Sequence, residues 1–244
     1  CPEALTAMKF LVEEGSYRYI MSGSLLGIEM KDLRSAPVGY IDIWEMYPLD
    51  LEEFFGAVGV SDTVMDHIKE SWNGMKPVDE VVHAKLMSIV RLYLIVGGMP
   101  AVVEKYLETN NLQSVMEVQK AILRLYEVDI AKYDPNRKLY IREIFNLIPP
   151  ELNAKNKRFI LKNLNEKIKF SRYENSFIWL KDAGVALPTF SVEAPTSPLA
   201  LSRSRNLFKL FQSDVGLLAA TYADGIQLRI LDDNPDTNLG AIYA

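Results

Sequence analysis

The sequence has little cysteine and little histidine, since Cys1, His67 and His83 are the only such residues among 244. A single cysteine excludes an internal disulfide framework and is typical of reducing compartments. These three residues are also too few for a four-ligand zinc site built from Cys and His. Neither histidine stands in an H-E-x-x-H pattern or beside a plausible serine partner, and the acidic pairs are adjacent in sequence, so that on a helix they point apart. The sequence therefore contains no catalytic constellation of its own.

Long apolar runs are also absent. No run approaches the roughly 20 residues that a membrane-spanning helix needs, and no signal peptide opens the sequence. With 49% hydrophobic and 24% charged residues, the composition is ordinary for a globular protein with a buried core. We expect a cytoplasmic protein without a membrane segment. Because the chain opens on Cys1 inside an amphipathic pattern, we also expect it to be a piece of a longer protein.

A phosphate-binding loop is missing, although one stretch invites the comparison. The run "YIMSGSLLGIEMK" places Gly23 and Gly27 with only three residues between them, and Ile28 stands where a P-loop has lysine. A P-loop needs G-x-x-x-x-G-K-[ST], because its backbone N–H groups surround the phosphates and its lysine reaches the terminal ones. The local pattern by itself predicts a short strand followed by a tight loop.

What is present is mostly helical periodicity. Apolar residues at three- and four-residue spacings predict helices, and alternating or short apolar runs predict strands. The expected helices lie at residues 2–14, 51–55, 61–72, 78–96, 101–110, 112–129, 139–147, 153–167 and 172–184, with another beginning at Asp214. Strands are expected at residues 17–21, 38–49, 185–192 and 206–213. We predict a mixed α/β fold that is mostly helical.

Several boundaries carry specific signals. Asp50 is a credible N-cap, because Glu52 and Glu53 follow in the first turn. "GGMP" should end one helix, and its proline should start the next. Pro149 and Pro150 are expected to end the helix that begins at residue 139. The three helices that follow residue 138, with the strand pair after them, have the order of a winged helix.

Basic residues gather in one window. Residues 137–172 contain ten basic and three acidic side chains, a net charge of +7, whereas the whole chain carries −5. If residues 153–167 are helical, then Lys155, Arg158 and Lys162 lie on one face, which could enter a DNA groove while Arg203 and Arg205 meet phosphates. The alternative is that these cations face solvent or dock against an acidic neighbouring domain.

An ordered set of motifs resembles a known family. The motifs are "SGSLLG", "SAPVGYIDIWEMYPLDLEEFF", "LYLIVGGMPAVV", "YEVDIAKY", "NKRFILKNL", "AGVAL", "PLAL" and "FKLFQSDVGLLAA". In this order and spacing they resemble the prokaryotic AAA-type P-loop ATPases (STAND-like) that carry a nuclease-like C-terminal domain. The resemblance runs from Cys1 to about Tyr243, although no single motif is decisive.

The resemblance implies a domain order and site residues. Residues 1–60 would be the C-terminal part of the ATPase α/β domain, 61–120 a helical lid, 121–205 a winged helix and 206–244 the start of the nuclease-like domain. Ser22 or Ser24 would stand at the sensor-1 position, and Gly97, Gly98 and Pro100 would form the part of the lid near the nucleotide. Lys155, Lys157, Arg158 and Lys162 would contact DNA or a docked domain.

ATP and Mg²⁺ are implied as cofactors of the parent protein only, because the Walker A and Walker B parts would precede this chain. We do not expect the chain alone to bind nucleotide tightly or to hydrolyse ATP. The implied partners are the P-loop region and C-terminal domain of the same protein, and DNA. The alternative is a stand-alone winged-helix DNA-binding or scaffold protein without nucleotide chemistry. A G-x-x-x-x-G-K-[ST] sequence upstream of Cys1 would distinguish the two.

Overall fold

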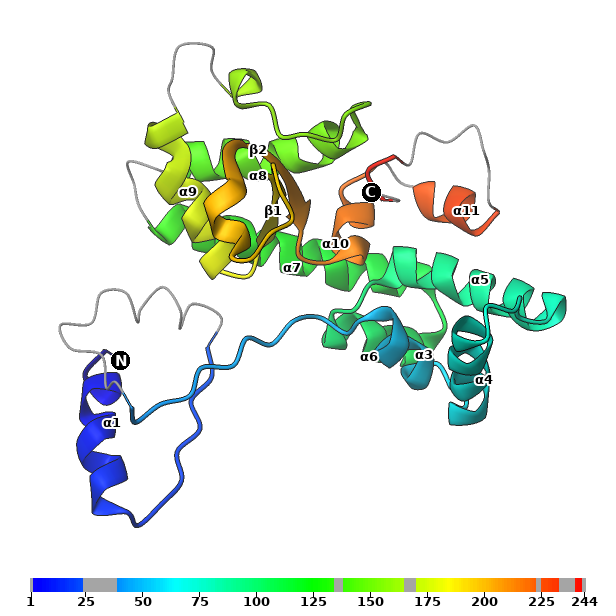
Figure 1. Cartoon of the computed structure of the whole chain (residues 1–244), viewed down its shortest axis with the longest axis horizontal. Helices are drawn as coiled ribbons and strands as arrows, with labels where there is room; N and C mark the ends of the chain where they lie inside the picture. Colours follow the sequence, from blue (N-terminus) through cyan, green and yellow to red (C-terminus); the bar gives the residue numbers. More distant parts are fainter. Residues whose placement is uncertain are drawn as a thin grey trace.

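The computed structural model describes residues 2–23, 39–133, 138–164, 170–222, 225–232 and 240–242. In this part of the chain, helices predominate and two strands form a small antiparallel sheet. The prediction of a mixed α/β and mostly helical fold is therefore confirmed. Figure 1 shows the helices arranged around two long ones, α5 (Glu80–Val96) and α7 (Leu112–Tyr133).

The N-terminal helix lies apart from the other helices (Figure 1). It is α1 (Pro2–Glu14), and it ends at Gly15, which has a φ of 74° as the predicted stop signal requires. Residues 39–49 precede the next described helix without forming a helix or a strand, and among them Trp44 is 90% exposed and Met46 98% exposed.

The two strands predicted in the N-terminal part are wrong for its described residues. Neither residues 17–21 nor residues 39–49 form a strand. Both segments have strand-like sequences, but a strand needs a neighbour to pair its N–H and C=O groups. In the described part of the chain, neither segment has such a neighbour.

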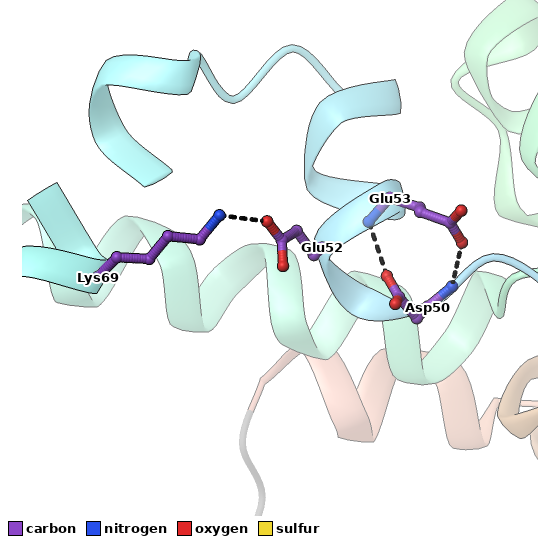
Figure 2. Close-up of polar contacts among 4 residues, drawn as sticks. All are labelled: Asp50, Glu52, Glu53 and Lys69. Atoms are coloured by element: carbon purple, nitrogen blue, oxygen red, sulfur yellow. Dashed lines mark hydrogen bonds and ion pairs between the residues drawn. The ribbon is translucent and has the colours of Figure 1, made fainter. Parts of the chain in front are cut away.

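The helix that follows is stabilised at its start by a capping box. Helix α3 (Leu51–Ala57) begins after Asp50, whose carboxylate accepts from the Glu53 N–H at 2.8 Å. The Glu53 carboxylate in turn accepts from the Asp50 N–H at 2.9 Å (Figure 2). These two bonds satisfy N–H groups that a helix start leaves without partners. Glu52 points the other way and pairs with Lys69 of α4 (Asp62–Asn73) at 2.7 Å (Figure 2).

A small hydrophobic cluster joins the helices around the predicted lid. Helix α5 ends at Gly97, and α6 (Pro100–Thr109) begins with Pro100 as its first residue, as predicted. Helices α3, α5, α6 and α7 contribute the buried residues of this cluster. They are Phe54, Val96, Val102, Val103 and Val115.

Helix α8 (Lys138–Asn153) continues through the two prolines that were predicted to end it. That prediction is wrong because tertiary packing offsets the local cost. Ile148 and Leu152 flank the prolines and are almost completely buried, with 0% and 1% of their surfaces exposed. Burying two large aliphatic side chains contributes about 3–6 kcal/mol, against about 6 kcal/mol for two helical prolines.

The helix predicted at residues 153–167 is also wrong for the residues described. Residues 154–160 are a turn followed by an extended segment, and only η2 (Leu161–Asn163) is a short 3₁₀ turn. Phe159 explains the difference, because its ring is 4% exposed and its N–H donates to the Phe208 carbonyl at 3.0 Å. The segment is therefore held against a strand. The Glu151 carboxylate reinforces this by accepting from the Ile160 N–H at 2.9 Å.

The two predicted C-terminal strands are confirmed. Helix α9 (Phe170–Asp182) ends before Gly184, whose φ is 67°, and leads to β1 (Ala186–Val192). Strand β1 pairs antiparallel with β2 (Arg203–Gln212), in a register that places Phe190 opposite Phe208. The short 3₁₀ turn η3 (Leu199–Ser202) lies in the connection. Helices α7, α8 and α9 and this sheet together bury the larger hydrophobic cluster.

Two short helices in the C-terminal part of the described chain pack against α5. Helix α10 (Val215–Ala220) begins after Asp214, as predicted, and contacts both α5 and α7. Helix α11 (Ile226–Leu231) also packs against α5 (Figure 1). Ala241 and Ile242 are buried in the larger cluster. Among the described helices, none combines the length and the apolar character that crossing a membrane would require.

Candidate functional site

The turn that follows α5 lies where the two hydrophobic clusters meet. Ile95 belongs to the larger cluster and Val96 to the smaller one. The carbonyls of both residues accept from the Gln119 side-chain amide of α7, at 2.8 and 3.1 Å. Gln119 thereby satisfies carbonyls that the end of a helix leaves without intrahelical partners. The turn itself begins at Gly97, which has a φ of 75°.

The Asp214 carboxylate is the charged group at this turn. Asp214 is 3% exposed, and its two oxygens accept from the Gly98 N–H at 2.7 Å and from the Leu217 N–H at 2.8 Å. Burial raises its pKa, and hydrogen bonds from the backbone N–H groups of Gly98, Leu217, Gly216 and Met99 oppose that rise. One carboxylate thus caps α10 and holds the turn between α5 and α6.

The same turn is bound to the segment that precedes α3. The Leu49 N–H donates to the Gly98 carbonyl at 2.8 Å, and the Tyr93 hydroxyl donates to the Leu49 carbonyl at 2.9 Å. Burial and the nearby negative charge of Asp214 raise the pKa of Tyr93 to about 12. The neutral hydroxyl, which is the form that donates this bond, is therefore the form present at neutral pH.

Glycine is required at this junction by close packing. A Cβ on Gly97 would lie 2.7 Å from one Asp214 carboxylate oxygen, and one on Gly98 would lie 2.8 Å from the Leu49 backbone nitrogen. A Cβ on Gly216, in the first turn of α10, would lie 2.6 Å from the Gly97 nitrogen. We call this arrangement the Asp214 junction; it comprises Leu49, the turn Gly97–Met99, Asp214 and Gly216.

The Asp214 junction contains two of the three residues predicted to form a nucleotide lid, Gly97 and Gly98. Gly97 and Gly98 are buried, and protein atoms fill the space beside them, so packing within the chain accounts for their lack of side chains. Pro100 is exposed at the start of α6. Ser22 is exposed on the extended N-terminal segment, and Ser24 lies outside the described residues. The structure does not bring Ser22 to the Asp214 junction, and the nucleotide role of these residues stays a prediction.

The arrangement at the Asp214 junction fits a structural contact between elements better than a catalytic site. The carboxylate is surrounded by backbone N–H donors, which are neither metal ions nor general bases. Within the described ranges, no group of three or more His, Cys, Asp or Glu residues could hold a metal ion. The Asp214 carboxylate, whose two oxygens already accept from backbone N–H groups, therefore does not fit a Mg²⁺ ligand.

Two open grooves, each about 290 Å³ in volume, lie elsewhere on the molecule. One lies beside the ends of α3 and α6, lined by Val58, Lys85, Ile89, Leu92, Tyr106, Leu107 and Asn110. The other lies at the end of α8, lined by Pro149, Pro150, Asn153, Thr221 and Tyr222. Neither lining includes a predicted site residue or a pair of ionisable groups with opposite roles.

The predicted basic stripe is wrong as a helical feature. Lys155, Arg158 and Lys162 are exposed, but they lie on the turn and loop that follow α8 and on η2, not on one helix. Lys157 has a φ of 51°, and its ammonium group donates to the Gly240 carbonyl. We call Lys155, Arg158 and Lys162 the basic loop.

The predicted wing contacts are only partly described. The guanidinium group of Arg203 stacks over the Phe190 ring, 3.3 Å from its centroid. The side chain of Arg205 lies outside the described residues. Arg203 thus stacks on the Phe190 ring of β1, while the residue as a whole stays exposed.

Sequence reasoning missed Asp214 as part of a site. It identified the residue only as the start of a helix. One sequence signal could have indicated this site. Two short stretches, "GGMP" and "SDVG", each contain glycine, and the second also contains the acidic Asp214. Nothing local in either stretch says that they meet, because 116 residues separate Gly98 from Asp214.

Comparison with known proteins places the chain in a family. The family model described as Domain of unknown function (DUF8612) matches residues 87–228, more than half of the chain. The chain therefore belongs to this family, and the match includes the Asp214 junction except for Leu49. Neither the curated proteins nor the solved structures give a match.

Proposed function

We propose that this chain is the lid and winged-helix part of a prokaryotic AAA-type ATPase. In this proposal, an α/β domain outside the described residues binds ATP and Mg²⁺. Its nucleotide state moves the segment before α3, and the lid and winged helix pass that movement to a surface that binds DNA or another domain. The sequence resemblance and one structural observation support the proposal.

The supporting observation is an extended segment with apolar side chains on both faces. Along residues 40–48, Trp44 and Met46 share one face, whereas Ile43 and Tyr47 share the other. All four are strongly exposed, at 90%, 98%, 69% and 58%. A strand that is apolar on both faces is typical of a parallel α/β sheet, which helices cover on both sides. The segment therefore has the properties of a strand whose sheet belongs to another domain.

The end of this segment connects to the Asp214 junction. The Leu49 N–H donates to the Gly98 carbonyl, the Leu49 carbonyl accepts from the Tyr93 hydroxyl, and Asp50, the next residue, caps α3. A displacement of the segment would therefore act directly on the turn Gly97–Met99. This connection provides the coupling that the proposal requires.

The element order after residue 138 supports the winged-helix part of the proposal. Helix α8 is followed by an extended stretch bonded to β2, then by η2, α9 and the hairpin β1–β2. This is the order of a winged helix, in which the helix before the hairpin lies on the exposed side of the sheet. Here the exposed positions of α9 include Glu174, Ile178 and Lys181, so this helix is not itself strongly basic.

The accessibility of Trp44 tests the ATPase part of the proposal. We expect the gene product that extends upstream of Cys1 to contain G-x-x-x-x-G-K-[ST] and to bury Trp44 in its sheet. In a Trp72→Phe background, the remaining tryptophans are exposed Trp44 and Trp179, which is 2% exposed. Acrylamide should quench this variant strongly in the present chain and much less in the longer product.

Trp44→Phe is the matched control, because it leaves Trp72, which is 82% exposed. Its quenching should be equal in both lengths of protein. Equal quenching of Trp44 in the two contexts, or an upstream region without the phosphate-binding sequence, would contradict the ATPase proposal and favour the stand-alone protein.

DNA binding by the basic loop is the second candidate function. Lys155, Arg158 and Lys162 are all exposed within eight residues, and their window carries the excess positive charge. Exposed cations that are close together neutralise phosphates and release counterions, which makes binding depend on salt. This candidate is independent of nucleotide chemistry.

Changing the three basic-loop residues to glutamate should abolish salt-dependent binding of duplex DNA. Each phosphate contact contributes about 0.9 to the slope of log K against log salt, so the loss of three should flatten it by roughly 2.7. Fluorescence anisotropy with labelled duplex at two salt concentrations measures this. Changing Lys76, Lys85 and Lys105 to glutamate alters the net charge equally and should leave most of the binding. If the unchanged chain is folded by circular dichroism and binds no DNA at low salt, the candidate fails.

A further inference from the structure

We propose that Asp214 is a latch that joins the turn after α5 to α10, and that it can open while the larger core stays folded. The proposal does not depend on ATP or DNA, since it concerns only how two parts of this chain are connected. It rests on the hydrogen bonds, the burial and the close packing at the Asp214 junction.

The first argument is the position of the carboxylate. Its bonds reach the turn after α5 on one side, through Gly98, and the first turn of α10 on the other, through Leu217. A normal N-cap serves only its own helix. Asp214 also serves a turn more than one hundred residues earlier, so the loss of one side chain would remove both the cap and the connection.

The second argument is that the two parts interlock around that carboxylate. Gly97 leaves the space that the carboxylate occupies, and Gly216 leaves the space that the backbone of Val96 and Gly97 occupies. The Gly216 contacts are backbone against backbone, and the Gly97 contact is with the carboxylate itself, so neither part can slide along the other while the carboxylate is in place. Separation therefore requires the carboxylate to leave its N–H donors, which makes the connection closed or open rather than gradually loosened.

The third argument is the local character of the contact. Removing a charged partner from buried N–H donors carries a larger penalty than losing a neutral hydrogen bond. However, most of the buried side chains of the larger cluster come from α8, α9 and the sheet, whereas α10 contributes Leu218 and Ala219. Opening the latch should therefore expose the amides of the turn and of α10 before those of α8.

Residue-resolved hydrogen exchange in the Asp214→Ala chain tests this latch. We expect the amides of Gly98 and Leu217 to exchange at least about tenfold faster than in the unchanged chain. The amides of Ile144 and Ile148, in the buried part of α8, should keep their rates. Added formate should restore protection at Gly98 and Leu217, because it supplies carboxylate oxygens to the same donors, whereas chloride at equal ionic strength should not.

Asp79→Ala is the matched control, since it removes the exposed cap at the start of α5, far along the helix from the junction, and should accelerate exchange only there. If Asp214→Ala fails to fold, Asp214→Asn keeps the size of the side chain and carries the test. It should accelerate exchange at Gly98 without a formate effect, because the side chain still fills the space. Equal acceleration at Gly98 and in α8, or unchanged exchange at Gly98, would overturn the latch.

Discussion

A Gly98→Ala chain is expected to lose on the order of 3 kcal/mol of unfolding free energy. The added Cβ would lie 2.8 Å from both the backbone nitrogen and the carbonyl carbon of Leu49. Backbone atoms cannot rotate away as the end of a side chain can, so the turn and the segment before α3 must move apart. That movement would also weaken the 2.8 Å hydrogen bond from the Leu49 N–H to the Gly98 carbonyl. Urea unfolding followed by circular dichroism measures the loss.

Gly56→Ala provides the control for this substitution. Gly56 lies inside α3, and a Cβ there would meet no atom within 4 Å. Alanine in a helix interior is more favourable than glycine by up to about 1 kcal/mol, so this variant should be unchanged or more stable. If Gly98→Ala unfolds at the same urea concentration as the unchanged chain, then the close packing of the Asp214 junction is wrong.

The second large effect is expected from Phe208→Ala, which should lower the unfolding free energy by about 3–5 kcal/mol. Phe208 is 3% exposed and lies at the centre of an aromatic group. Its ring centroid lies 5.8 Å from that of Phe159, 5.2 Å from that of Phe177 and 5.4 Å from that of Phe190. These rings come from the loop after α8, from α9 and from β1, so the substitution would loosen three elements at once.

Leu201→Ala is the control for Phe208→Ala. Leu201 lies in the connection between β1 and β2 and is 85% exposed, so its truncation should change the unfolding free energy by less than about 0.5 kcal/mol. Thermal unfolding of the two variants under the same conditions gives the comparison. Similar midpoints for both would mean that the aromatic group contributes little and that the sheet is held in another way.

The sequence correctly predicted the helix ends that are stabilised by residues close together in the chain. Asp50 caps α3 through a bond to Glu53, and Gly15 and Gly184 adopt the positive φ that ends a helix. Pro100 begins α6 because a first-turn residue needs no N–H partner. In each case the deciding contacts lie within a few residues, so the sequence pattern contains the information.

The predictions that were wrong concern segments whose conformation is decided by contacts with residues far away in the sequence. The prolines of α8 do not end it, because Ile148 and Leu152 pack in the core. The loop after α8 is not helical, because Phe159 is bonded to Phe208 of β2. The basic stripe failed for the same reason, since it assumed helical spacing for residues that follow the path of that loop.

The strand predictions show both outcomes. Residues 186–192 and 203–212 are strands because each supplies the other's hydrogen-bond partners across a hairpin. Residues 39–49 have an equally strand-like sequence, yet they form no strand among the described residues, where no partner strand pairs with them. A strand's own side chains favour extended structure, but only a neighbour completes it.

The sequence by itself determined the mixed α/β class and most helix positions, because composition and short-range periodicity express these directly. It also marked "GGMP" as the boundary between two helices and Asp214 of "SDVG" as the start of another. Only the tertiary structure decided that these two segments, with Leu49, form one junction around a buried carboxylate. The physical reason is that their contacts join residues 116 positions apart in the chain, and such proximity follows from the packing of α5, α7 and α10, which no local pattern encodes.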